Sequence, residues 1–147
     1  MKKKWFILLG ILVVIAVPIA WYLLSPLFIV VEMDEAAPED TVMLSEALFQ
    51  ARTHDVSGKV FIIDSSGTKI LRFEDFETLN GPDLRVYLAT DTNAEDYIDL
   101  GELKATKGNV NYDLPDDVDL SKYKYVLIWC RAFSVLFGYA ELPAEEI

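Results

Sequence analysis

The sequence predicts an all-β domain, an antiparallel β-sandwich or squat β-barrel, preceded by one N-terminal transmembrane helix. Three observations support this prediction. Residues 5–31 contain no Asp, Glu, Lys, Arg or His. After residue 55, short β-branched and aromatic runs alternate with Gly, Pro, Asn and Asp, as in antiparallel strands joined by turns. Nothing in that region has the spacing of a long amphipathic helix. The 147 residues leave room for one ordinary domain after the helix.

Residues 5–31 are long enough to cross about 30 Å of hydrocarbon as a tilted helix. A cleaved signal peptide has a shorter apolar region that ends at small residues. Residues 17–20 (VPIA) are a weak site of that kind, and apolar sequence continues well past them. We therefore expect an uncleaved anchor that contacts the lipid bilayer through residues 5–31. Trp5 and Trp21 suit interfacial positions, although Trp21 is somewhat deep for a span of this length.

Charged residues on the two sides of this segment predict its orientation. Three lysines, at positions 2 to 4, precede it, and Glu32, Asp34 and Glu35 follow it. Basic residues stay on the cytoplasmic side of a membrane span. We expect residues 1–4 to form a cytoplasmic basic tip, the protein to be a single-pass protein of the cell membrane, and the rest of the chain to be extracytoplasmic.

The part of the chain beyond the span is strongly acidic. Without the three N-terminal lysines, ten basic residues stand against 24 acidic ones, a balance of −14. Such a domain repels phosphates, so nucleic acid is excluded as a partner. Acidity of this kind more often keeps a surface solvated than defines a partner, and the partners left open are a membrane or a surface protein.

Residues 32–41 are acidic, contain Pro38 and lack apolar periodicity, which predicts a short stalk before a domain at 42–147. The stretch that follows, residues 41–51, is ambiguous. Ser45 could cap a short helix, or a strand could end at Phe49, and both readings stay open.

The remaining strands have clearer signals. Residues 59–73 predict a hairpin, because a turn-forming Asp-Ser-Ser-Gly quartet separates two β-branched and aromatic runs. Residues 84–90 alternate apolar and other side chains, as a half-buried strand does, with Arg85 and Tyr87 on the outer side. Residues 123–130 and 133–142 are apolar on both faces, which predicts central strands.

Few residues suggest chemistry. The chain has no phosphate-binding loop, dinucleotide fingerprint, nucleophile elbow or paired-histidine metal motif. Residues 91–96 carry oxygen ligands but lack the glycine and terminal glutamate of a calcium loop, so we read them, like residues 115–120, as solvated loops. The single histidine, His54, and the single cysteine, Cys130, remain. We do not expect an enzyme with its own turnover.

Composition alone favours a structural role for both residues. A lone cysteine cannot form an internal disulfide; in an oxidising compartment it is buried and inert, paired with another chain, or reactive. In a regular strand Cys130 faces the side opposite to Trp129, Arg131 and Phe133. We expect Trp129, Phe133 and Phe137, which share one strand parity, to fill the core rather than line a pocket.

The order of several fragments between residues 49 and 142 changes this weighting. They include Gly81-Pro82-Asp83-Leu84, then Leu100-Gly101, Gly108 and Trp129-Cys130. Together they resemble the DM-thirteen domain, a small extracellular β-rich family often described as an electron-transfer domain. The resemblance implies that Cys130 and His54 are redox or ligand residues, and it leaves haem or a metal open as the cofactor.

The remaining residues of the family motif read as structural: Gly81, Pro82, Asp83, Leu84, Gly101, Gly108 and Trp129. Two functions follow. One is a membrane-anchored domain with a redox or electron-transfer role centred on Cys130. The other is a non-enzymatic cell-surface module that binds a ligand or a protein. The exposure of Cys130 discriminates between them, because thiolate chemistry requires access and a stabilising neighbour.

Overall fold

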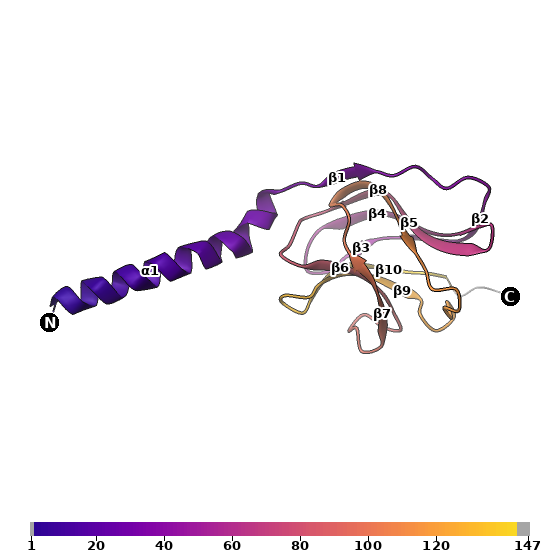
Figure 1. The fold of residues 1–147 in the computed structure, drawn as a ribbon. Coiled ribbons are helices and arrows are strands. Elements are labelled where there is room, and N and C mark those ends of the chain that lie inside the picture. Colours follow the sequence, from indigo (N-terminus) through magenta and orange to yellow (C-terminus); the bar gives the residue numbers. More distant parts are fainter. Residues whose placement is uncertain (1, 144–147) are drawn as a thin grey trace.

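The computed structural model describes residues 2–143, and it shows a mostly β chain with one N-terminal helix. Met1 of the predicted basic tip and residues 144–147 of the predicted domain lie outside this part. The helix α1 spans Lys2–Leu24, and a short 3₁₀ helix, η1, follows at Ser25–Phe28. Ten strands come next and form two sheets (Figure 1). The predicted fold class, a β-sandwich after an N-terminal helix, is confirmed.

Helix α1 is long and apolar enough to cross a membrane. Its 23 residues give a length of about 35 Å at 1.5 Å per residue. The helix ends seven residues before the predicted limit at residue 31, and the chain continues as the 3₁₀ helix η1, in which Pro26 is the second residue. Trp21 therefore lies in the last turn of the helix, where it is 75% exposed, and not deep within the apolar segment.

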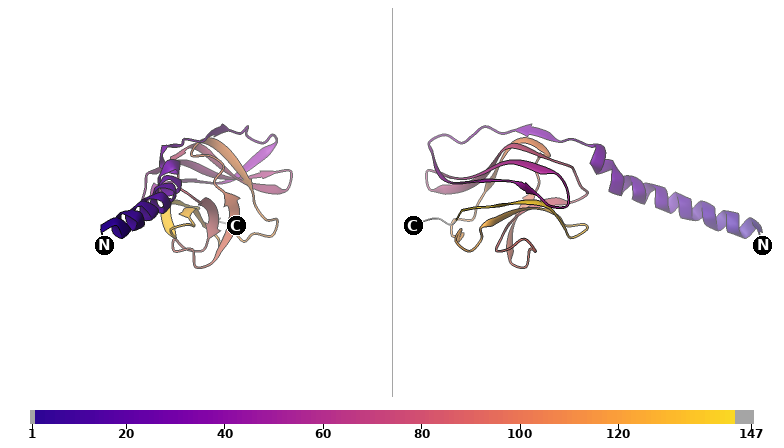
Figure 2. Two further views of the ribbon diagram at one scale, coloured as in Figure 1. Left: turned by 60° about the vertical axis from the view of Figure 1, so that its left-hand side comes forward. Right: turned by 180° about the vertical axis from the view of Figure 1, so that it is seen from behind.

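The two sheets lie face to face as two layers (Figure 2). The first sheet contains, in spatial order, β1 (Glu32–Asp34), β8 (Lys107–Asp113), β5 (Thr68–Thr78), β4 (Val56–Ser65) and β2 (Thr41–Leu48). The second contains β3 (Gln50–Ala51), β10 (Val135–Glu141), β9 (Tyr125–Cys130), β6 (Leu84–Ala89) and β7 (Tyr97–Glu102). All pairs are antiparallel except β1 with β8, which is parallel.

Two local predictions can be compared directly with the strands. The ambiguous stretch at 41–51 is the edge strand β2, which pairs with β4, and not a helix. The predicted hairpin is β4–β5, in which Ser65 faces Thr68 across a two-residue turn. Both turn residues have positive φ, 53° and 90°, as a type I′ turn requires, and the second is Gly67.

The core lies between the sheets and is built from inward-facing apolar side chains of both. Strands β9 and β10 occupy central positions in the second sheet, as predicted. Strand β6 differs from its prediction, because Tyr87 on its outer side is only 2% exposed. The ring of Tyr97 stacks on that of Tyr87 at a centroid distance of 4.1 Å, and the ring of Trp129 lies 6.2 Å from the Tyr87 ring. The strand is therefore covered on both faces.

The predicted stalk is partly built into the first sheet. Its first three residues form β1, with Glu32 opposite Lys107 and Met33 opposite Gly108. Gly108 has φ of 115°, and a Cβ at this position would collide with the carbonyl oxygen of Met33. Only glycine combines this backbone conformation with so close an approach. The segment that joins α1 to the domain is thus a paired strand and not a free linker.

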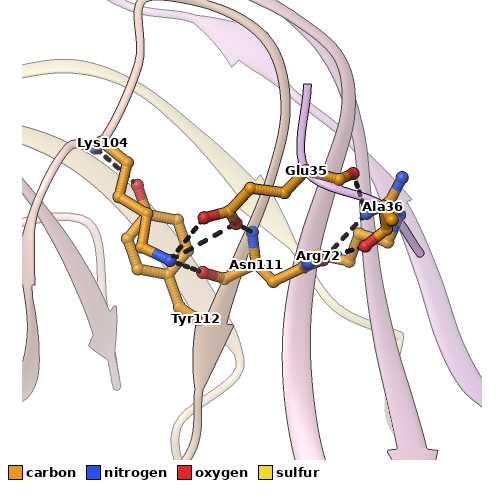
Figure 3. Close-up of polar contacts among 6 residues, drawn as sticks. All are labelled: Glu35, Ala36, Arg72, Lys104, Asn111 and Tyr112. Carbon is orange, nitrogen blue, oxygen red and sulfur yellow. Dashed lines mark hydrogen bonds and ion pairs between the residues drawn. The ribbon is translucent and has the colours of Figure 1, made fainter. Parts of the chain in front are cut away.

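A set of polar contacts, which we call the β1 clasp, holds the chain just beyond β1 (Figure 3). It consists of Glu35, Arg72, Lys104 and Asn111. The Glu35 carboxylate accepts hydrogen bonds from the Asn111 N–H, at 2.6 Å, and from Lys104 Nζ, at 3.1 Å. The buried Arg72 guanidinium donates to the Glu35 carbonyl oxygen at 3.1 Å and to Asn111 Oδ1 at 2.9 Å. These contacts join residues that lie 37 to 76 positions apart in the sequence.

The β1 clasp should weaken in acid. Burial tends to raise the pKa of Glu35, but the hydrogen bond from the Asn111 N–H and the pairing with Lys104 outweigh it and hold the pKa below its ordinary value of 4.5. A depressed carboxylate pKa contributes stability that is present above the unfolded value and lost as pH falls through the folded one. Urea unfolding at pH 6 and at pH 3.5 should therefore show a smaller acid-induced loss of stability in Glu35→Gln than in the wild type. Equal losses would contradict this assignment.

Candidate functional site

One end of the sandwich faces α1 (Figure 1). Residues 103–106, between β7 and β8, lie at this end, and so do three further loops: residues 52–55 between β3 and β4, residues 79–83 between β5 and β6, and residues 131–134 between β9 and β10. We call these three the α1-proximal loops. They contain or adjoin both candidate redox residues and the Gly-Pro-Asp-Leu motif. These loops meet because of the strand directions. Strands β3, β5 and β9 end at this end of the sandwich, and strands β4, β6 and β10 begin there.

A cavity of about 420 Å³ opens between the α1-proximal loops and the end of α1. Its wall is almost wholly apolar, and its lining side chains include Leu23, Leu24, His54, Phe133, Val135 and Phe137. The imidazole of His54 packs on the Phe137 ring at a centroid distance of 4.1 Å. Thr53 and residues 80–82 complete the lining. Such a cavity suits an apolar molecule with one polar group that can meet the histidine.

A bulge in β10 positions the histidine. The register of β10 against β9 shifts between Leu136 and Gly138, so Phe137 is an extra residue. Its carbonyl oxygen accepts backbone N–H groups from three successive residues, including His54 at 3.3 Å. A Cβ at Gly138 would lie 2.7 Å from the carbonyl oxygen of Gln50 and from Val56. The loop can therefore fold tightly over the bulge only because residue 138 is glycine.

Cys130 lies behind this wall and not in it. It is the last residue of β9, its exposure is 0%, and it belongs to the same core cluster as Phe137. Its register partners are Val135 on β10, which lines the cavity, and Leu84 on β6. The structure thus places His54 at the cavity and Cys130 in the core at the same end of the sandwich. The cysteine has no access to solvent in this conformation.

The sequence predicts that three aromatic residues fill the core rather than line a pocket. Only Phe137, 5% exposed, lies in the core, and it also lines the cavity. Phe133 is 55% exposed, because the strand ends at Cys130 and the phenylalanine falls in the turn. Trp129 packs on the outer face of the second sheet, beside Tyr87. Strand parity failed here because it assumes a regular strand, whereas the turn and the bulge interrupt it.

The Gly-Pro-Asp-Leu motif forms one rim of the cavity. A Cβ at Gly81 would meet Leu84 and Phe137 side chains at 3.2 Å, so a larger residue would press on both. The Asp83 carboxylate accepts a hydrogen bond from Arg131 Nε at 2.7 Å, and its carbonyl oxygen accepts the Arg131 N–H at 2.9 Å. Asp83 therefore fastens the turn that carries Phe133 to the loop that carries the motif.

Asp83→Ala should lower the melting temperature slightly and loosen the 131–134 turn, because the ion pair with Arg131 lies at the surface and is screened by solvent. Faster hydrogen exchange of the Arg131 amide relative to the Ile128 amide, followed by NMR, would report the loosening. Asp64→Ala, in a turn at the opposite end, provides a control that should leave these two amides unchanged. An unaltered Arg131 amide would show that Asp83 does not hold the turn.

The residues present do not fit a metal centre built from side chains. Within residues 2–143, no three His, Cys, Asp or Glu side chains gather as ligands. Cys130 does not line the cavity, so it does not face a group bound beside His54. Histidine alone could meet the iron of a haem or one polar group of an organic ligand.

Several residues at this end were missed by sequence reasoning. Leu23 and Leu24 read as ordinary residues of the membrane span, and only the end of α1 at Leu24 places them beside the cavity. Asn80 precedes the recognised motif, and its Nδ2 donates to the Ile29 carbonyl oxygen at 3.1 Å. The Leu-Asn-Gly-Pro sequence around Asn80 predicts a loop. It does not predict that Asn80 contacts Ile29, which lies 51 residues earlier in the chain.

The comparisons with known proteins give one result. The sequence model of the family described as Electron transfer DM13 matches residues 48–142, almost two thirds of the chain. This range begins at the end of β2 and includes both β-sheets except β1 and most of β2. No curated protein and no solved structure matches the chain.

Proposed function

Because the chain belongs to the electron transfer DM13 family, we propose that it is a single-pass membrane protein whose DM13 domain lies outside the cytoplasm and takes part in electron transfer, with Cys130 as the redox-active side chain. The family match is the observation that carries this proposal. Helix α1 serves as the anchor and the sandwich as the working part.

Charge supports the orientation. Lysines precede the apolar part of α1, and β1 and the residue after it supply Glu32, Asp34 and Glu35. In this orientation the basic residues stay in the cytoplasm. A protease added to intact cells should degrade the domain and spare the N-terminal lysines. A tag fused after residue 147 that proves to be cytoplasmic would refute the orientation.

The chemistry proposed for Cys130 is thiol–disulfide exchange. Its thiolate attacks a disulfide of a partner protein, forms a mixed disulfide with one sulfur and releases the other as a thiolate. In the closed structure the sulfur is inaccessible, so this reaction requires local opening. The position of Cys130 favours such opening, because a four-residue turn follows it directly and the next strand begins at Val135.

A specific observation favours a second function, a non-enzymatic module that binds a ligand or a protein. Cys130 is completely buried, whereas His54 lines an apolar cavity at the surface. In this function the cysteine fills space, and the histidine provides the polar contact that orients an apolar ligand. The two functions differ in what they require of the thiol.

Thiol labelling of the full-length protein in lipid nanodiscs separates the two functions, since the chain has one cysteine. A redox cysteine should react with a maleimide or an aromatic disulfide at least tenfold faster than the rate set by global unfolding. The global rate comes from the exchange of core amides such as that of Val86, which is completely buried.

Labelling only at the global unfolding rate would refute the redox role and leave the binding module. Cys130→Ala provides the reagent blank, and it should lower stability by about 1–2 kcal/mol, the cost of a small cavity. An absorption spectrum of the same purified sample tests for a bound haem, which would coordinate through His54 and should disappear in His54→Ala.

A further inference from the structure

The α1-proximal loops expose apolar side chains that the proposed electron transfer does not use. Phe133, in the turn between β9 and β10, is 55% exposed, and Leu79, at the start of the next loop, is 46% exposed. Between η1 and β1, Ile29 and Val30 are 52% and 70% exposed. These residues come from three separate segments that meet at one end of the sandwich.

This end lies at the level of the last turn of α1. Leu23 and Leu24 line the same cavity as Phe133 and Val135, so the helix end and the β9–β10 turn stand side by side. The 20 residues from Trp5 to Leu24 span about 30 Å, the thickness of the hydrocarbon layer. When α1 crosses a bilayer, its last turn therefore lies at the boundary with the headgroups, and Phe133 lies there too.

The connection between helix and sandwich is short and fastened. Seven residues separate Leu24 from β1, and four of them form η1. The Ile29 carbonyl oxygen accepts a hydrogen bond from Asn80, and the Val31 carbonyl oxygen accepts the Thr106 N–H at 2.8 Å. The Val31 N–H in turn donates to Thr106 Oγ1 at 2.9 Å. These bonds fasten residues 29–31 to the sandwich, so that only η1 separates the end of α1 from the fastened segment.

Charge distinguishes this end from the other. The α1-proximal loops contain two basic and two acidic residues, a balance of zero. At the opposite end, the loops 36–40, 90–96 and 114–124 contain eight acidic residues and two lysines. An anionic bilayer surface repels the second end, and at a neutral surface its carboxylates would lose hydration on insertion. The α1-proximal loops carry no net charge and avoid the repulsion.

We propose that the α1-proximal loops rest on the outer surface of the bilayer, with Phe133 and Leu79 inserted among the lipid headgroups. This inference depends on the proposed function in taking α1 as the membrane anchor and, for the outer side of the membrane, in the orientation of α1. Phe and Leu are among the side chains that membrane-surface segments bury at the headgroup boundary, and the apolar cavity then opens toward lipid rather than water. The DM13 domain is thereby held in one orientation, with its acidic loops pointing away from the membrane.

Spin labels on the full-length protein in phosphatidylcholine nanodiscs test the proposal. In a Cys130→Ala background, single cysteines are introduced as Phe133→Cys, as Val14→Cys in the middle of α1, and as Glu95→Cys in an acidic loop. The measurement compares relaxation of each label by oxygen, which concentrates in lipid, with relaxation by a water-soluble nickel chelate. The ratio should favour oxygen at positions 14 and 133 and nickel at position 95, with positions 133 and 95 differing at least fivefold.

The controls separate failure of this inference from failure of the anchor. A label in lipid at position 14 but in water at position 133 would overturn the surface contact and leave the anchor intact. Water at both positions would overturn the anchor, and this inference with it. Leu79→Cys provides a second label on the same end, so the test stands if Phe133→Cys does not fold, and a water-exposed label at position 79 would likewise overturn the contact.

Discussion

Gly108→Ala should detach β1 from β8 and lower the free energy of unfolding by about 3–5 kcal/mol. Two costs combine. The residue has φ of 115°, where a side chain adds about 1–3 kcal/mol of strain. The new Cβ would also collide with the carbonyl oxygen of Met33, which has no room to retreat because β1 is paired there. Equilibrium unfolding in urea, followed by circular dichroism, measures the change.

Gly101→Ala is the matched control for this substitution. Gly101 has nearly the same φ, 113°, but nothing lies within 4 Å of the position a Cβ would take. It should therefore incur the backbone strain alone, about 1–3 kcal/mol. Hydrogen exchange at the amides of Glu35 and Thr106, which bond across the β1 region, should accelerate in the Gly108 variant only. Equal effects of both substitutions would show that the approach of Met33 is not what requires glycine.

Arg72→Met should destabilise the domain by about 3 kcal/mol and free the segment after β1. Arg72 is 6% exposed, and its guanidinium donates to Glu74 at 2.7 Å as well as to the two acceptors of the β1 clasp. Methionine preserves much of the volume of arginine but leaves three acceptors without this donor. Acceptors that lose a buried cationic donor and are not rehydrated lower the free energy of unfolding. Glu74 is 38% exposed, so solvent moderates the cost.

Lys59→Met is the control for the loss of a cation from the same sheet. Lys59 lies 3.9 Å from Glu46, and both side chains are nearly half exposed. Removal of such a pair should change stability by less than about 0.5 kcal/mol. Chemical denaturation of both variants, with proteolysis near residue 36 as a local probe, distinguishes them. An Arg72 variant as stable as the Lys59 variant would refute the role assigned to the buried guanidinium.

Sequence patterns predicted the sandwich because β4, β5, β6, β9 and β10 carry signals of their own, whereas β7 and β8 were not predicted as strands. The β4–β5 hairpin follows from β-branched runs around a turn that requires positive φ, and β9 and β10 are central because both of their faces are apolar. Strand β1 has no such signal. It contains three residues, two of them acidic, and it is a strand only because β8 offers an edge and Gly108 admits its backbone. Tertiary context of this kind is not present in local sequence.

Sequence reasoning named some residues of the candidate site, but it missed Leu23, Leu24 and Asn80 and did not predict the arrangement. The resemblance to the family singled out Cys130 and His54, and both lie at the end of the sandwich where the Gly-Pro-Asp-Leu motif also lies. Their arrangement depends on the register of β10 against β9. Cys130 falls on a core position and is buried, whereas the bulge at Phe137 places the histidine at the cavity. A one-residue shift reverses the facing of a strand, and sequence periodicity does not reveal where such shifts occur.

The parallel pairing of β1 with β8 has a mechanical consequence for an anchored domain. Tension between the membrane and the opposite end of the domain would act along β1, because this strand runs from the end near α1 toward that end. Bonds loaded along the strands share the force in shear, whereas a strand pulled sideways unzips one bond at a time. The β1 clasp follows the β1–β8 hydrogen bonds along the chain. There the hydrogen bonds of Arg72 and Asn111 oppose further displacement of the chain past β8. A force on the domain would therefore load the pairing of β1 with β8 before it loads the core.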